Sequence, residues 1–175
     1  TIVNYDNAMK LVAVERELVE PNAPAQKKSL RDAIRLLPDG ESRWQQLQAE
    51  VYGPGIGQAE LIAGVDEFIK ACIKLGCPIY IVSHKTEFAE LGSDTNLRKS
   101  AMTWMENQGF FSTNGLGFSK DHVYFETTRC AKLNRIGSLN CTHFIDDLEE
   151  TFLEKSFPAN TAKYLYAPHG SDASI

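Results

Sequence analysis

The sequence predicts an α/β protein in which helices flank a parallel sheet and a helical segment is inserted near the N-terminus. After residue 58, short apolar runs typical of strands alternate with helical segments of about 10 to 15 residues. Such alternation is typical of right-handed βαβ units, whose strands lie parallel. Before residue 58 the apolar residues recur at helical spacing, which predicts a helical insertion rather than part of the sheet.

Three amphipathic helices are expected in the first part of the chain, at residues 7–20, 26–37 and 41–51. Their apolar residues recur three or four positions apart, and Pro21 is expected to end the first helix. The glycine-rich residues 52–57 follow. They lack the Lys-Ser/Thr ending of a phosphate-binding P-loop and follow no obvious strand, so a linker or hinge is favoured over a phosphate loop.

Strands and helices are expected to alternate in the remainder of the chain. The expected strands are residues 78–82, 123–125, 142–145 and 163–166. The expected helices are residues 59–75, 95–108, 129–139 and 148–155. No internal repeat and no low-complexity segment interrupts this order. The pattern therefore predicts a single α/β core after residue 58.

Composition and charge restrict the classes of function. The chain has 175 residues, a formal net charge of −5 and a hydrophobic content of 43%. These values are typical of one globular domain with a sizeable core and argue against disorder. A net negative charge gives no electrostatic basis for binding nucleic acid or an anionic membrane. No apolar run approaches the roughly 18 residues needed to span a membrane, and no signal-peptide pattern opens the chain.

The four cysteines point to a reducing compartment. They form no C-x-x-C pair, and no cysteine–histidine spacing is that of a zinc site. Cys72, Cys77 and Cys141 lie in or beside apolar runs, so we expect buried thiols there. Nothing in their arrangement is typical of a small disulfide-stabilised secreted protein. A cytoplasmic protein is expected.

Polar side chains follow three of the expected strands at their carboxyl ends. They are, in chain order, Ser83, His84, Lys85, Arg129, Lys132, Asp146 and Asp147. In an open parallel sheet, ligands bind in the crevice beyond the carboxyl ends of the strands, so these side chains are expected to face one crevice. Taken singly, each has a structural interpretation: Ser83 as a strand-end cap, Lys132 as a surface lysine, and the two acids as the start of the next helix.

As a group, these residue types indicate phosphoryl transfer. Adjacent carboxylates such as Asp146 and Asp147 are costly at a buried strand end unless a cation compensates them. Mg²⁺ suits the position, because it needs only one or two protein carboxylates and keeps several waters. A lysine and a serine, here Lys132 and Ser83, provide the point charge and the hydrogen-bond donor that a phosphate requires. The set predicts a Mg²⁺-dependent phosphoryl-transfer site.

Three of these features resemble motifs of the haloacid-dehalogenase-like (HAD) hydrolase superfamily. The strand IYIVS ending at Ser83, the downstream Lys132, and the strand ending FIDD at Asp146 and Asp147 match its second, third and fourth motifs in order. The resemblance covers nearly the whole chain and is strongest after residue 58. It implies a HAD-like Rossmannoid parallel sheet, with Ser83 and Lys132 holding the transferred phosphoryl group and the two acids holding Mg²⁺. His84, Lys85 and Arg129 would contact substrate, although Arg129 would equally suit local hydrogen bonding.

The resemblance also implies a domain organisation. Residues 1–7 would start the core, residues 8–57 would form a helical cap of the C1 type, and residues 58–175 would form the α/β core. Residues 52–57 would then be one of the cap hinges, which are expected to gate solvent. Such a cap favours a small phosphorylated metabolite as substrate, since closure over the site excludes large ones.

The first motif of the superfamily, D-x-D-x-T, has no intact copy in this chain. In one hypothesis, Thr1 is the threonine of this motif and joins the catalytic residues, while the first strand with its nucleophilic Asp precedes it. In the other, Asn4 replaces the nucleophile. Because Asn cannot form the aspartyl-phosphate of the covalent mechanism, that protein would be an inactive phosphate-binding or interaction protein. We expect a phosphatase. Phosphomutase or dehalogenase chemistry is a third hypothesis, but dehalogenation needs no metal.

Overall fold

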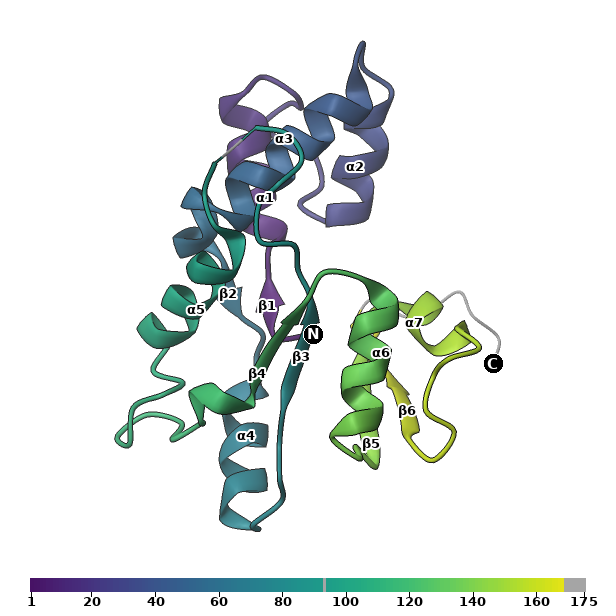
Figure 1. The fold of residues 1–175 in the computed structure, drawn as a ribbon. Coiled ribbons are helices and arrows are strands. Elements are labelled where there is room, and N and C mark those ends of the chain that lie inside the picture. The colour runs from purple at the N-terminus through teal and green to yellow at the C-terminus, as the bar shows by residue number, and fades with distance from the viewer. Residues whose placement is uncertain (93, 169–175) are drawn as a thin grey trace. The chain divides into compact units, whose positions relative to one another are not determined.

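A computed structural model describes residues 1–92 and 94–168 of the chain (Figure 1). The α-helices in this part are α1 (Asp6–Glu15), α2 (Lys27–Arg35), α3 (Gly40–Tyr52), α4 (Val65–Lys74), α5 (Leu97–Asn107), α6 (Arg129–Ser138) and α7 (Glu149–Leu153). The strands are β1 (Val3–Asn4), β2 (Glu60–Leu61), β3 (Ile81–His84), β4 (Val123–Glu126), β5 (His143–Asp146) and β6 (Ala162–Leu165). Two 3₁₀ helices are η1 (Pro54–Gln58) and η2 (Lys120–His122).

The mixed α/β class expected from the sequence is confirmed, but a single parallel sheet is not what the described residues form. Their strands form three separate pairs. Strands β5 and β6 are parallel, with Asp146 opposite Leu165, and α7 lies between them in the chain as expected of a βαβ unit. Strand β3 pairs with β4. Strands β1 and β2 are antiparallel and only two residues long, below the usual strand length of about 3–10 residues.

The chain divides into two compact units. Residues 2–80 and 86–123 form the first, which we call the helical unit. Thr1, residues 81–85 and the described chain from residue 124 onward form the second, which we call the strand–helix unit. All helices of the expected cap lie in the helical unit, together with α4 and α5. The cap at residues 8–57 and the core at residues 58–175 stay predictions.

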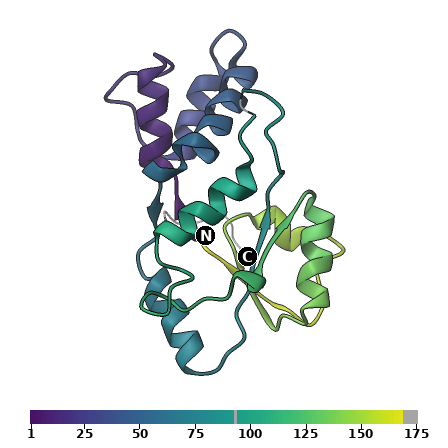
Figure 2. The same ribbon diagram turned by 60° about the vertical axis from the view of Figure 1, so that its left-hand side comes forward.

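The core of the helical unit lies between α1, α2 and α3, which pack against one another (Figure 1). Its buried residues are Ala8, Met9, Val12, Ala13, Leu18, Leu30, Ile34, Trp44, Leu47 and Val51. Within each helix these residues recur three or four positions apart, so they share one face. The β1–β2 pair joins the two ends of this segment, because the chain leaves through β1 and returns beside it through β2 (Figure 2).

Helix α1 is shorter than expected and ends before Pro21 is reached. It stops at Glu15, and Glu17 adopts a left-handed conformation with φ 56°. The Leu18 N–H donates to the Ala13 carbonyl at 2.8 Å, and the Glu17 N–H donates to the Val14 carbonyl at 2.9 Å. These two bonds define a Schellman turn, which usually carries glycine at the left-handed position. The sequence gives no glycine there, which explains the wrong boundary.

The helix expected over residues 59–75 is wrong in its first part. Residues 60 and 61 form β2 instead, because they pair with β1 at the start of the chain. Helix α4 then begins at Val65, after Gly64 with φ 85°. The glycine-rich residues 52–57 are also more regular than expected: α3 extends to Tyr52 and η1 begins at Pro54. Their role as a hinge stays a prediction.

The strand–helix unit contains the strand ends at which the site was expected. Strand β3 begins at Ile81, later than expected, and therefore includes Ser83 and His84 rather than ending before them. Helix α6 packs against β3 and begins at a capped end, where the Thr128 Oγ1 accepts from the Ala131 N–H at 3.1 Å. Phe152 and Phe157 pack edge-to-face beneath β5, with their ring centroids 5.5 Å apart.

No helix in residues 1–92 and 94–168 is long and apolar enough to cross a membrane.

The helical core gives a first testable prediction. Leu47 of α3 is 0% exposed, whereas Leu36, just after α2, is 88% exposed. Leu47→Ala is expected to lower the free energy of unfolding by about 2–5 kcal/mol, because it removes buried contacts and leaves a cavity. Leu36→Ala, the matched control, is expected to change it by less than about 0.5 kcal/mol. Urea unfolding followed by circular dichroism measures both. Equal effects would contradict this placement of the core.

Candidate functional site

Lys132 and Asp146 form a buried ion pair at the carboxyl end of β5. The Lys132 Nζ lies 2.5 Å from the Asp146 Oδ2, and the two side chains are 9% and 4% exposed. The second carboxylate oxygen of Asp146 accepts from the Leu148 N–H at 3.0 Å. Both oxygens of Asp146 are therefore hydrogen-bonded, as a buried carboxylate requires.

Local structure explains why these two side chains meet. Thr128 fixes the start of α6, so Lys132 lies one turn into the helix, on the side that also buries Leu133 and Ile136. Asp146 is the last residue of β5, and its own carbonyl accepts from the Tyr166 N–H at 2.8 Å, which holds the strand end beside β6. The Lys132 Nζ also lies 5.3 Å from the centre of the Phe144 ring, within cation–π range.

Asp147 lies next to the buried pair in sequence and contacts the first residue of the chain. The Thr1 hydroxyl donates to the Asp147 Oδ1 at 2.8 Å, and the Thr1 ammonium lies 3.3 Å from the same oxygen. Loss of water around the carboxyl raises its pKa, but the ammonium charge and the Thr1 hydrogen bonds outweigh this effect. The pKa of Asp147 is consequently below its ordinary value. The hydroxyl bond itself does not depend on the terminal charge.

Ser83, His84 and Lys85 lie on β3 or directly after it, in the same unit as the ion pair. The His84 Nε2 is 3.1 Å from the carbonyl oxygen of Thr127, and the Lys85 N–H donates to the Glu126 carbonyl at 2.9 Å. Both contacts hold the end of β3 to the end of β4. Ser83 is half-buried. Their roles in binding phosphate and substrate stay predictions.

Arg129 is engaged locally. Its Nη1 lies 3.0 Å from the Glu154 Oε1, and both side chains are about 40% exposed. Of the two interpretations of this residue from the sequence, the local ion pair is the one seen. Asn4, the alternative to the nucleophile, belongs to the helical unit, where its Oδ1 accepts from the Asp6 N–H at 2.9 Å at the start of α1.

The structure thus brings together two pairs of the predicted site residues, Lys132 with Asp146 and Thr1 with Asp147, although neither contact was itself predicted. Across residues 1–92 and 94–168, no three side chains of the types His, Cys, Asp and Glu are grouped so that they could hold a metal ion. The residues predicted to bind Mg²⁺ are Asp146 and Asp147, and that role stays a prediction. The first is tied to a lysine, whereas the second has a side chain that is 55% exposed.

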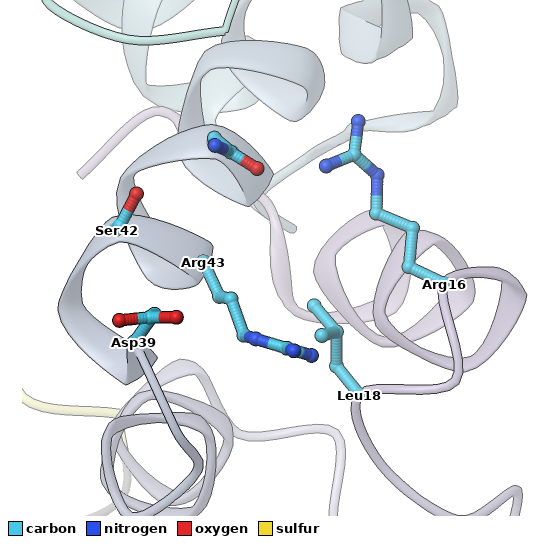
Figure 3. A pocket seen from close by; sticks show the side chains of 6 residues that line it. Arg16, Leu18, Asp39, Ser42 and Arg43 are labelled. Carbon is cyan, nitrogen blue, oxygen red and sulfur yellow. The ribbon is translucent and has the colours of Figure 1, made fainter.

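A pocket in the helical unit was not expected from the sequence (Figure 3). It has a volume of about 440 Å³ and is lined by Arg16, Leu18, Asp39, Ser42, Arg43 and Gln46. Figure 3 shows Arg43 extending from α3 towards Leu18, with Arg16 beyond. Arg16 is ion-paired with Glu50. The pocket depends on the early end of α1, and the sequence carried no signal for that end.

Comparison of the chain with protein-family models, with curated proteins and with solved structures found no match.

The buried pair makes a prediction about stability. Lys132→Met leaves the Asp146 carboxylate buried without its cation, and is expected to lower the free energy of unfolding by about 3–5 kcal/mol. The matched control is Arg129→Met, which breaks the exposed Arg129–Glu154 pair and is expected to cost at most about 1 kcal/mol. Chemical unfolding measures both. Equal losses in the two variants would show that the Lys132–Asp146 pair is not buried in solution.

The contact between Thr1 and Asp147 makes a prediction about pH. Because its pKa is lowered in the folded state, ionised Asp147 stabilises the protein above the ordinary aspartate value of about 3.9, and this stabilisation is lost as the pH falls through the lowered pKa. Thr1→Val should raise the pKa of Asp147, which carboxyl NMR titration measures. Ser138→Ala, which removes an exposed hydroxyl bonded to the Arg135 carbonyl, should leave it unchanged. An unshifted titration in Thr1→Val would contradict the contact.

Proposed function

We propose that the protein is a Mg²⁺-dependent phosphomonoester hydrolase of the HAD-like type that acts on a small phosphorylated metabolite. One observation carries the proposal. Lys132 and Asp146, which the motif resemblance assigns to phosphate and to metal, are in direct contact although 14 positions separate them in the chain. A surface lysine, the structural alternative for Lys132, would not be buried in this way.

Lys132 is the proposed phosphate-binding cation. An ammonium group has three N–H donors, of which one faces Asp146, so two remain for phosphoryl oxygens. Its burial and the neighbouring Phe144 ring reduce screening by water, which strengthens its attraction for an anion. Asp146 holds the ammonium in place before substrate arrives, so little reorganisation is needed when charge develops on the phosphoryl group.

Ser83 is proposed to donate its hydroxyl hydrogen to a second phosphoryl oxygen. Support comes from its place on β3, the strand against which α6 packs, in the unit that also holds the ion pair. His84 and Lys85, at the end of the same strand, are proposed to contact the rest of the substrate. Arg129 is proposed to act at the periphery, since its guanidinium already pairs with Glu154.

The carboxylates are proposed to form a Mg²⁺ site with only one or two protein ligands. Asp147 is proposed to bind the ion directly through its exposed carboxylate, with Asp146 beside it. Mg²⁺ accepts one or two protein carboxylates and completes its shell with water and phosphate oxygens. When bound there, the ion supplies positive charge against the phosphoryl group. Lys132 and Asp146 keep their own contact in either case.

The nucleophilic aspartate is proposed to precede Thr1. Its carboxylate would attack phosphorus, and the substrate alcohol would leave, giving an aspartyl-phosphate that water then hydrolyses. Support comes from the Thr1–Asp147 hydrogen bond, because a segment joined to Thr1 starts beside the acids. Further support comes from the described strands of this unit: β3–β4 and β5–β6 are separate pairs, so an additional strand has edges to join. Asn4, by contrast, is used at the start of α1.

Turnover of a generic phosphomonoester tests the proposal. The protein with its native residues before Thr1 is expected to hydrolyse p-nitrophenyl phosphate when Mg²⁺ is present, whereas the chain that starts at Thr1 is expected to bind inorganic phosphate without turnover. Ser83→Ala should lower kcat by about 10²–10³-fold, because it removes one donor to the developing charge. Lys155→Ala, which alters an exposed lysine, is the control and should leave kcat unchanged.

Two outcomes would contradict the proposal in different ways. If the longer protein binds phosphate but hydrolyses no member of a broad panel of phosphomonoesters, it is the inactive phosphate-binding protein that the sequence left as the alternative. If the chain starting at Thr1 turns over substrate and Asp146→Asn abolishes this turnover, the nucleophile lies within the described residues. The first outcome would contradict the proposed enzymatic activity. The second would contradict only the proposed position of the nucleophile.

A further inference from the structure

The end of α4 brings two cysteines together. The Cys77 N–H donates to the Cys72 carbonyl at 2.9 Å, and the Gly76 N–H donates to the Ile73 carbonyl at 3.0 Å. Gly76 has φ 68°, so the three residues complete a Schellman turn with glycine at the left-handed position. In such turns the side chains of the first and last residues of the hydrogen-bonded loop, here Cys72 and Cys77, frequently contact each other.

The same turn ends other helices of the chain and shows what usually fills these two positions. The pairs joined in the same way at the ends of α1, α5 and α6 are Ala13 with Leu18, Met105 with Phe110, and Ile136 with Cys141. These side chains are buried or half-buried and form apolar contacts. At the end of α4, both positions hold thiols, and Cys77 is exposed rather than buried as its apolar surroundings in sequence suggested.

We propose that Cys72 and Cys77 form a reversible disulfide, so that the end of α4 is a site of oxidation by peroxides. The backbone hydrogen bond limits the separation of the two Cα atoms to at most about 6.8 Å, given standard bond lengths. That limit matches the upper end of the range found for disulfides, about 4.4–6.8 Å. The separation of the two Cα atoms is therefore one that a disulfide can span.

The two thiols have different roles in the reaction. Cys77 is exposed and reacts first: its thiolate attacks one oxygen of hydrogen peroxide, the O–O bond breaks, and a sulfenic acid forms while the departing hydroxide takes up a proton from solvent to give one water. The Cys72 sulfur then attacks the sulfenic sulfur and displaces a second water, leaving the disulfide. Burial raises the pKa of the Cys72 thiol and repulsion from Cys77 raises it further, and this repulsion reflects the proximity of the two groups.

The surroundings leave this site accessible. Ile73 and Leu75, which flank the turn, are 41% and 76% exposed. Of the remaining cysteines, Cys141 is half-buried beside Ile136, whereas Cys130 is exposed like Cys77 but has no second thiol joined to it by a helix-end turn, and its Sγ accepts a long hydrogen bond from the Asn134 side chain. Peroxide is therefore expected to act at Cys77 before it acts at Cys72 or Cys141, and the nearest thiol in the chain then completes the bond.

Peptide mass spectrometry without reductant tests the proposal. Trypsin cleaves after Lys70, Lys74 and Lys85, so Cys72 and Cys77 fall on separate peptides, 71–74 and 75–85. After treatment of the folded chain with hydrogen peroxide, these two peptides are expected to appear linked, with two hydrogens lost, and to separate again on addition of dithiothreitol. The variant Cys130→Ser/Cys141→Ser, which keeps the pair, should give the same linked species and lose both of its free thiols.

The variants that break the pair give the opposite result. Cys72→Ser should stop at a sulfenic acid on Cys77, which a dimedone probe labels, and should form no internal disulfide. Three outcomes would overturn the proposal: no linked peptide, a link from either cysteine to Cys130 or Cys141 in its place, or a Cys77 that is oxidised irreversibly in the wild-type chain while Cys72 keeps its thiol.

Discussion

The contact between the Lys132 ammonium and the Asp146 carboxylate is the constraint around which the strand–helix unit is arranged. A buried charge is stable only beside its partner, so the start of α6 and the end of β5 must stay in register with each other. The Thr128 cap fixes the start of α6, and the Leu148 N–H holds the Asp146 carboxylate at the end of β5. The same contact places a buried cation at the strand ends where Asp147 and Thr1 also lie.

The helical unit is held together by apolar packing rather than by charge. Its three N-terminal helices bury their facing stripes, and its ion pairs, such as Arg35–Glu41, are exposed and contribute little. The short β1–β2 pair holds the two ends of this helical segment side by side.

The boundaries of the helices and strands show which parts of the secondary structure the sequence patterns predict. Helices α2, α3, α5 and α6 lie close to where their apolar spacing placed them, since that spacing reflects burial. The predicted end of α1 was wrong because Glu17 adopts the left-handed conformation that glycine usually provides at a helix end. Strand β2 was missed because its partner lies far away in the chain. A local pattern carries no information about either a distant partner or a strained turn that tertiary packing stabilises.

The sequence by itself determined the mixed α/β class, the α6 and β5 segments, and the residue types that suggested phosphate chemistry. Only the tertiary structure decided which charges meet. It buries Lys132 against Asp146, joins Thr1 to Asp147 and pairs Arg129 with Glu154. It also arranges the strands of the described residues as separate pairs. The physical reason is the same throughout. Periodicity reports which residues face an interior, whereas the partner of a charge or a strand edge is fixed by segments that meet only after folding.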